Sequence, residues 1–279
     1  MSQCSGIRAT AMSARMSEGL RPLSRLGDML RRRRLTARQP RPQTARMNTR
    51  ANAGHNPAPD LVVDVISDVV CPWCYIGKRK LETALSELGH AEPHLDVSVR
   101  WHAFQLNPDL PPEGMPRVEY LAAKFGGARS AAEIHARVKS VGVEVGIPFD
   151  FDRIVRQPNT LDAHTVIAWA QRRDARLADA LVEGLFRAYF IEGRLLNDPA
   201  ELARVAGEAG FSAQEAQSSL ISVSLRSEVE AEDREARGVG INGVPFFIFN
   251  GRTAVAGAHD PGTLLEAITA ARIASQGHQ

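Results

Sequence analysis

The stretch VISDVVCPWCYIGKRKLE, residues 65–82, places two of the chain's three cysteines around a Pro-Trp dipeptide. The run LVVDVIS, residues 61–67, is short and rich in β-branched residues and therefore predicts a buried strand. Pro72 suits the first turn of a helix, where a missing N–H is harmless, and apolar residues then recur at helical spacing. The pattern thus places Cys71 and Cys74 where a strand gives way to a helix.

The rest of the chain extends this pattern into a fold. HLDVSVRWHAF (residues 94–104) alternates like a second strand, and residues 108–239 are predicted to be almost entirely helical. Two apolar runs joined by Asn-Gly predict a hairpin over residues 244–258, and a closing helix covers residues 260–274. This order predicts an α/β protein: a thioredoxin-like mixed sheet that carries a large inserted all-helical subdomain.

This fold divides the chain into four predicted segments. We expect a disordered basic tail (1–58), the first part of the thioredoxin-like domain (59–107), the helical insertion (108–239) and the second part of the domain (240–279). The tail is rich in Arg and poor in acids, so it is either a transit peptide or an over-extended start upstream of Met47. An RNA-binding arm is a third interpretation of such a basic segment.

The charge balance narrows the choice of partners. Residues 51–279 carry 22 basic and 30 acidic side chains, a net charge near −8, which gives no support for nucleic-acid binding by the folded part. No apolar run has the length of a membrane span, and three cysteines are too few for a disulfide scaffold. We therefore expect a cytoplasmic protein without membrane contact, or an organellar one if the tail is a transit peptide.

Three hypotheses compete for the CPWC motif. Cys71 and Cys74, together with His90 and His94, satisfy the spacing of a zinc site, but the cysteines open a helix instead of a knuckle, so we expect no metal. A pair of buried core cysteines is the second hypothesis. The third is thiol–disulfide exchange, because the start of a helix favours an anion and should stabilise the thiolate of Cys71.

Exchange assigns a different task to each thiol. Cys71 would be the exposed nucleophile, and Cys74, one turn further on, would be the shielded resolving thiol that attacks a mixed disulfide on Cys71. Between them, Pro72 starts the helix, and Trp73 offers apolar surface but no cationic partner for a thiolate.

More distant residues could complete the site. Val244 and Pro245 directly precede an apolar strand. If the peptide bond between them is cis, the Val244 backbone could pair with an extended substrate beside the cysteines. The alternative is a plain turn before the strand. Asp68 could accept a proton from Cys74 through water or simply cap a turn. His164 is either a packed histidine or a supporting group of the site. The predicted insertion would also leave an apolar cleft for unfolded or small apolar substrates.

The motifs resemble those of the DsbA family of thioredoxin-fold oxidoreductases, in particular its FrnE-like branch. The stretches that carry the resemblance are SDVVCPWCYIGKRKLE, WHAFQLNP, NTLDAH and GVPFFIF, within residues 61–274. The resemblance implies that Cys71 and Cys74 are the redox pair and that Pro245 is a cis-proline.

The function expected is therefore a protein disulfide oxidoreductase, with protein or small-molecule thiols and disulfides as partners and a homodimer as a potential assembly. Such an enzyme needs no cofactor beyond its redox-active Cys71–Cys74 disulfide, and glutathione is a potential co-substrate. The alternative is a glutathione-dependent transferase or isomerase of the kappa or 2-hydroxychromene-2-carboxylate isomerase kind, which the branch is similar to and which needs no resolving cysteine. A non-catalytic chaperone is a third class.

Overall fold

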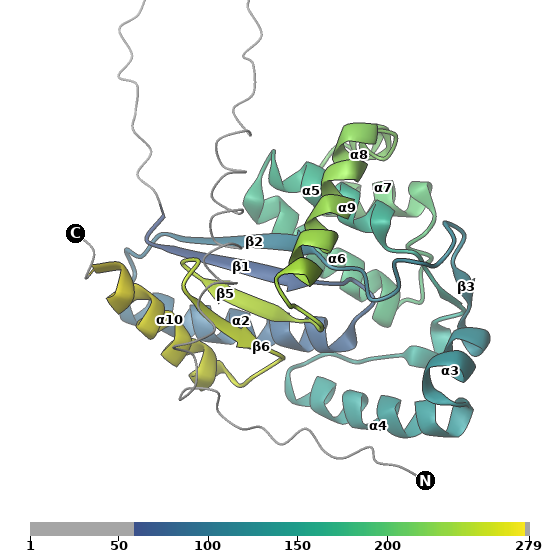
Figure 1. Ribbon diagram of the computed structural model, residues 1–279, viewed down its shortest axis with the longest axis horizontal. Coiled ribbons are helices and arrows are strands. Elements are labelled where there is room, and N and C mark those ends of the chain that lie inside the picture. Colours follow the sequence, from purple (N-terminus) through teal and green to yellow (C-terminus); the bar gives the residue numbers. More distant parts are fainter. Residues whose placement is uncertain (1–58, 277–279) are drawn as a thin grey trace, which may run out of the picture.

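The computed structural model describes residues 59–276 (Figure 1), so the predictions for the basic tail lie outside the described residues. The strands are β1 (Leu61–Ser67), β2 (Val97–Ala103), β3 (Met115–Pro116), β4 (Arg156–Gln157), β5 (Phe246–Phe249) and β6 (Thr253–Ala256). The helices are α2 (Pro72–Ala91), α3 (Arg117–Phe125), α4 (Ala128–Glu144), α5 (Leu161–Gln171), α6 (Ala175–Phe190), α7 (Pro199–Glu208), α8 (Ala213–Ser219), α9 (Val223–Gly238) and α10 (Pro261–Gln276). Within residues 59–276, no helix is long and apolar enough to cross a membrane.

The main sheet has the mixed topology that the sequence predicts. Its strand order is β2-β1-β5-β6, with β1 and β2 parallel and β5 antiparallel to both of its neighbours. The β5–β6 turn contains Asn250 and Gly251 with φ of 51° and 66°, the left-handed conformation for which the Asn-Gly pair is favoured. The strand–helix–strand unit and the hairpin therefore form one sheet, as expected.

The helical insertion lies between β2 and β5 in the sequence, and its helices α5, α6 and α9 pack on β2 (Figure 1). Helices α2 and α10 pack side by side, and α10 also contacts the β5–β6 hairpin. The fold is thus a thioredoxin-like sheet with a large helical insertion. Residues 108–239 are mainly helical, as predicted, but they also contain the β3–β4 pair and a 3₁₀ turn at Phe151–Arg153. These were not predicted, because elements of two or three residues leave no periodicity in a sequence.

Strand β2 is an edge strand whose backbone is satisfied by side chains of the insertion. The Gln171 amide accepts a hydrogen bond from the Trp101 N–H at 2.6 Å and donates one to the Trp101 carbonyl at 2.7 Å. The Glu232 carboxylate accepts one from the Ala103 N–H at 3.0 Å. The insertion therefore covers the edge at which another chain could otherwise pair.

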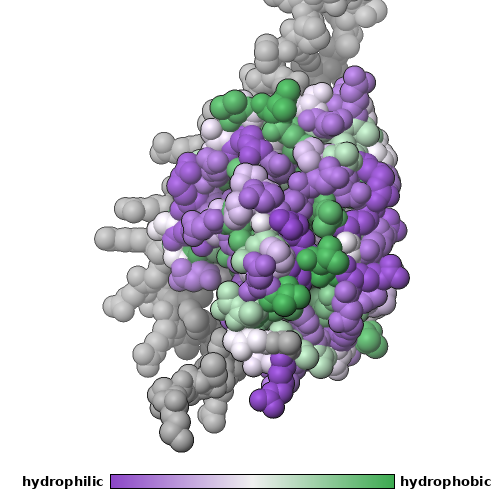
Figure 2. Space-filling view, turned by 90° about the vertical axis from the view of Figure 1, so that its right-hand side faces the viewer, coloured by the Kyte–Doolittle hydropathy of each residue, from purple (hydrophilic) through white to green (hydrophobic). Residues whose placement is uncertain are grey.

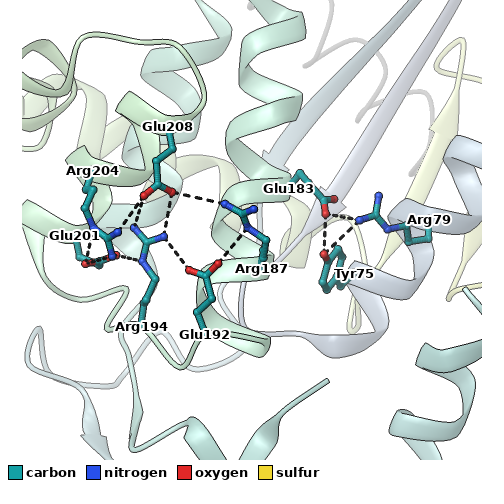
Figure 3. A network of polar contacts seen from close by, with 9 residues as sticks. All are labelled: Tyr75, Arg79, Glu183, Arg187, Glu192, Arg194, Glu201, Arg204 and Glu208. Carbon is teal, nitrogen blue, oxygen red and sulfur yellow. Dashed lines mark hydrogen bonds and ion pairs between the residues drawn. The ribbon is translucent and has the colours of Figure 1, made fainter. Parts of the chain in front are cut away.

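The larger of two hydrophobic clusters in residues 59–276 joins the sheet and the insertion. Tyr75, directly after Cys74 on α2, stacks on Phe186 of α6 with ring centroids 4.9 Å apart. Its hydroxyl donates to Glu183 at 2.7 Å, and Arg79 pairs with the same carboxylate (Figure 3). A second network in Figure 3 joins α6 to α7, because Arg187 of α6 pairs with Glu208 of α7. Arg194, in the loop between the two helices, pairs with Glu192, Glu201 and Glu208. The helix that begins at the cysteines is therefore fixed to both parts of the fold.

Candidate active site

Cys71 occupies the position just before the first turn of α2. Its backbone is extended (φ −96°, ψ 112°), Pro72 is the first helical residue, and no side chain caps the helix start. Its N–H donates to the Asp68 carbonyl at 3.0 Å, and its own carbonyl accepts from Cys74 N–H at 3.0 Å. The Cys71 sulfur thus lies at the amino end of a helix, where the helix dipole favours negative charge.

Both cysteines are free thiols and both are buried. Only 5% of Cys71 and 1% of Cys74 is exposed. The expectation that Cys71 is an exposed nucleophile is therefore wrong for the reduced protein. The chain around Val244 covers the Cys71 sulfur, and half-buried Trp73 packs against the same core. Of the two thiols, Cys74 is the more deeply buried, as expected.

The predicted second piece of the site is in place. The Val244–Pro245 peptide bond is cis, and the Cys71 thiol donates to the Val244 carbonyl across 3.6 Å. The bond lies directly before β5, which pairs with β1, the strand that leads to the cysteines. Sheet pairing therefore brings residues 173 positions apart into one site.

The environment of Cys74 opposes its ionisation. Burial raises the pKa of the Cys74 thiol well above its ordinary value, and the adjacent Cys71 sulfur raises it further. The Ser67 hydroxyl and the backbone at Asp68 act in the opposite direction and lower this pKa, but less. Cys74 is thus a protonated, shielded thiol until something removes its proton.

Asp68 and His164, which the sequence offers as supporting residues, are brought together beside the thiols. Asp68 is fully buried; its carboxylate accepts from the Leu106 N–H at 2.7 Å and from the Val70 N–H at 3.5 Å, so it does cap the turn. His164 Nε2 lies 3.4 Å from Asp68 Oδ1, close enough for an ion pair, but without the alignment of a hydrogen bond. His164 is therefore both packed and adjacent to the site.

The zinc-like spacing is not realised in space. Cys71 and Cys74 open α2, whereas His90 lies in its last turn, about 28 Å along the helix axis. The His90 ring contacts the Ser86 carbonyl and is exposed. Among residues 59–276, no group of three or more His, Cys, Asp or Glu side chains is placed to hold a metal ion.

Three features of the site were missed by the sequence argument. Ser67 ends β1 and lies beside Cys74, and a lone Ser at a strand end gives no signal of this role. Gly77 allows close packing of α2: a Cβ there would lie 2.9 Å from Pro245 Cγ. His102 is held between two carboxylates next to the site, and the one available signal was an acid inside the apolar strand LVVDVIS.

A family comparison agrees with this geometry. Residues 62–269 match the model of the DSBA-like thioredoxin domain. The matched region covers the sheet, the insertion, the CPWC motif and the cis-proline. The chain belongs to this family.

Two relatives each match more than two thirds of this chain. A crystal structure of a probable DsbA oxidoreductase, SCO1869 from Streptomyces coelicolor, is 30% identical, with a TM-score of 0.67, over 76% of this chain and 89% of that one. The uncharacterized protein YwbO of Bacillus subtilis is 26% identical over 201 residues, 70% of this chain and 90% of its own length.

More distant structures share the fold. The cytosolic disulfide reductase DsbM from Pseudomonas aeruginosa, solved with GSH, is 20% identical with a TM-score of 0.50, over 78% of this chain and 98% of that one. A 2-hydroxychromene-2-carboxylate isomerase is 18% identical with a TM-score of 0.54, over the same shares of the two chains. One fold therefore carries both a disulfide reductase and an isomerase, so the fold by itself does not define the reaction.

Proposed function

We propose that this protein is a thiol–disulfide oxidoreductase of the DsbA/FrnE type, in which Cys71 is the nucleophile and Cys74 the resolving thiol. The observation that carries the proposal is the placement of Cys71. Its sulfur lies at the amino end of α2, 3.6 Å from the carbonyl of the residue before cis-Pro245, with a second free thiol one turn behind it. An isomerase or transferase would need one thiol, whereas this site holds two.

The reaction uses both thiols in turn. The Cys71 thiolate attacks a substrate disulfide, forms a mixed disulfide and releases the first substrate thiolate, which takes up a proton. Cys74 then loses its proton and attacks the Cys71 sulfur, so that the Cys71–Cys74 disulfide forms and the second substrate thiolate leaves. Two electrons pass from the cysteines to the substrate, and the reverse sequence oxidises a dithiol.

The Val244 carbonyl gives the substrate a place to bind. It accepts from the Cys71 thiol in the reduced protein. A sulfur in a mixed disulfide carries no proton, so this carbonyl is then free to accept from a substrate N–H, as in strand addition. Figure 2, a view of the side of the molecule that lies at the right of Figure 1, shows apolar side chains among hydrophilic ones on this face. A backbone acceptor beside the nucleophile suits a peptide or a small thiol with an N–H group, such as glutathione.

The test is to trap the intermediate. In a Cys4→Ser background, so that only the pair remains, Cys74→Ser should accumulate a mixed disulfide at Cys71 when treated with glutathione disulfide. Intact-mass analysis should show one glutathione per chain, and catalysed reduction of insulin disulfides should collapse, because no thiol remains to resolve the adduct. Cys71→Ser is the matched control and should form no adduct.

The same variants separate the alternatives. Undiminished conjugation or isomerisation of a glutathione adduct in Cys74→Ser, without disulfide reduction by the wild type, would instead support the transferase or isomerase function. Suppression of aggregation that persists when both cysteines are Ser, again without reductase activity, would support the chaperone function. Either outcome would contradict the proposal.

A further inference from the structure

A small cavity lined by Ser67, the residue beside Cys74, lies on the side of the sheet covered by the insertion. It measures about 10 Å³, room for about one water molecule. Its polar lining comes from Ser67, His102, His164 and Glu232, and the remaining lining residues are mainly apolar side chains of β2, α5 and α6. None of the thiol–disulfide exchange steps proposed above involves this cavity.

Two of the lining side chains have a buried polar atom without a hydrogen bond. Ser67 and His164 are 5% and 4% exposed, and both Ser67 Oγ and His164 Nε2 lack a hydrogen bond. Leaving a buried polar atom unpaired costs about 1–3 kcal/mol, and ordered water is the usual way in which proteins satisfy such atoms. Two unpartnered polar atoms on one water-sized cavity therefore indicate a bound water.

One of these two residues lies beside Cys74, and the other lies beside the Asp68 carboxylate. The Ser67 hydroxyl lies next to the Cys74 sulfur, although not in hydrogen-bond geometry. His164 Nε2 lies 3.4 Å from Asp68 Oδ1. Because Cys74 is 1% exposed, its proton has no direct route to solvent.

We propose that this cavity holds one water molecule and that Ser67, the water and His164 carry away the proton that Cys74 releases when it attacks the mixed disulfide on Cys71. This inference rests on the proposed function and adds positioning residues to the same site. The titratable groups around the route are Cys71 and Cys74 from α2, Asp64 from β1, Asp68 from the turn that follows it, His102 from β2 and Glu232 from α9.

The proton balance of the step is simple. The Cys74 proton passes to Ser67 Oγ, the Ser67 proton to the water, and a water proton to His164 Nε2, which requires the tautomer with its proton on Nδ1. The imidazolium then forms an ion pair with Asp68. The Cys71–Cys74 bond forms as the bond between Cys71 and the substrate sulfur breaks, and the substrate thiolate leaves with the electron pair.

The test separates the two chemical steps. The reduced protein, in the Cys4→Ser background so that only the pair reacts, is mixed in a stopped-flow instrument with an aromatic nitrobenzoate disulfide. This reagent releases one coloured thiolate when Cys71 attacks and a second when Cys74 resolves the adduct. Ser67→Ala and His164→Gln should leave the first phase within about twofold of wild type and slow the second on the order of a hundredfold, the usual size of a general-base contribution. Thr165→Val, on the same helix turn, is the matched control and should change neither phase.

The pH profile distinguishes proton transfer from mere packing. In His164→Gln the rate of the second phase should rise in proportion to hydroxide concentration, because hydroxide must then remove the Cys74 proton, whereas in the wild type this rate should depend less steeply on pH. A normal first phase with an unchanged second phase in both variants would overturn the relay alone. Absence of the first phase in the wild type would contradict the proposed function and the relay with it.

Discussion

At the scale of single residues, the site is bordered by a buried charge. His102 contacts Asp64 Oδ1 through Nε2 at 3.0 Å and Glu232 Oε1 through Nδ1 at 2.8 Å. Burial alone would lower its pKa, but the two carboxylates outweigh this and raise the pKa of His102 to about 10. The ring is therefore charged at neutral pH and links β1, β2 and α9.

This charge predicts how stability should change with pH. His102→Gln should lower the free energy of unfolding by about 3 kcal/mol near neutral pH, because two buried carboxylates lose their cation. Since the folded pKa lies above the unfolded value of about 6.5, the His102 contribution is complete below about pH 6.5 and is lost as pH rises toward 10. Urea unfolding of wild type and variant at several pH values measures the difference; a difference that stays constant or grows over this window would contradict the assignment.

At the scale of elements, the active site depends on how closely α2 approaches β5. A Cβ at Gly77 would lie 2.9 Å from Pro245 Cγ and 3.2 Å from Phe247 Cζ. A proline ring cannot swing aside as a flexible chain can. The absence of a side chain at one helical position therefore sets the distance between the cysteine helix and the cis-proline.

Gly77→Ala should therefore displace the Pro245 segment from Cys71. We expect at least a tenfold loss in the rate of disulfide reduction and a destabilisation of about 1–3 kcal/mol from overpacking. Gly89→Ala, in the same helix with nothing within 4 Å of the added Cβ, is the control and should raise stability by up to about 1 kcal/mol with unchanged activity. Equal effects of the two substitutions on rate and stability would show that this contact does not matter.

At the scale of the whole molecule, ionic contacts join the sheet domain to the insertion. The Lys78 side chain of α2 is 3% exposed and pairs with Glu82 of its own helix and with Asp179 and Glu183 of α6. Burial alone would lower the pKa of Lys78, but these carboxylates raise it above its ordinary value. The amine therefore stays charged in the interface between the two parts.

Removing this cation should weaken the whole fold. Lys78→Met leaves three carboxylates around an apolar side chain and should cost about 3–5 kcal/mol, with α2 and α6 losing amide-exchange protection together because they share one core. Arg172→Gln, which breaks an ion pair with the exposed Glu228, should change stability by less than about 1 kcal/mol. Loss of protection confined to one of the two helices would contradict the coupling.

The sequence alone determined most of the architecture, because strand and helix periodicity, the Pro at the helix start and the Asn-Gly turn are local signals. LVVDVIS predicted β1 to the residue, and the long run of helical periodicity predicted the insertion. The CPWC motif offered Cys71 and Cys74 as a pair, and the family resemblance implied the cis bond before Pro245, which the structure contains.

The depth of the site and the groups around it depend on how the helices pack on the sheet. Burial of Cys71, the approach of Val244, the contact of His164 with Asp68 and the charge on His102 all arise between residues far apart in the chain. Desolvation and ion pairing depend on which groups become neighbours when the helices pack on the sheet. No local pattern of residues carries that information, so the environment that controls the two thiols becomes visible only in the folded molecule.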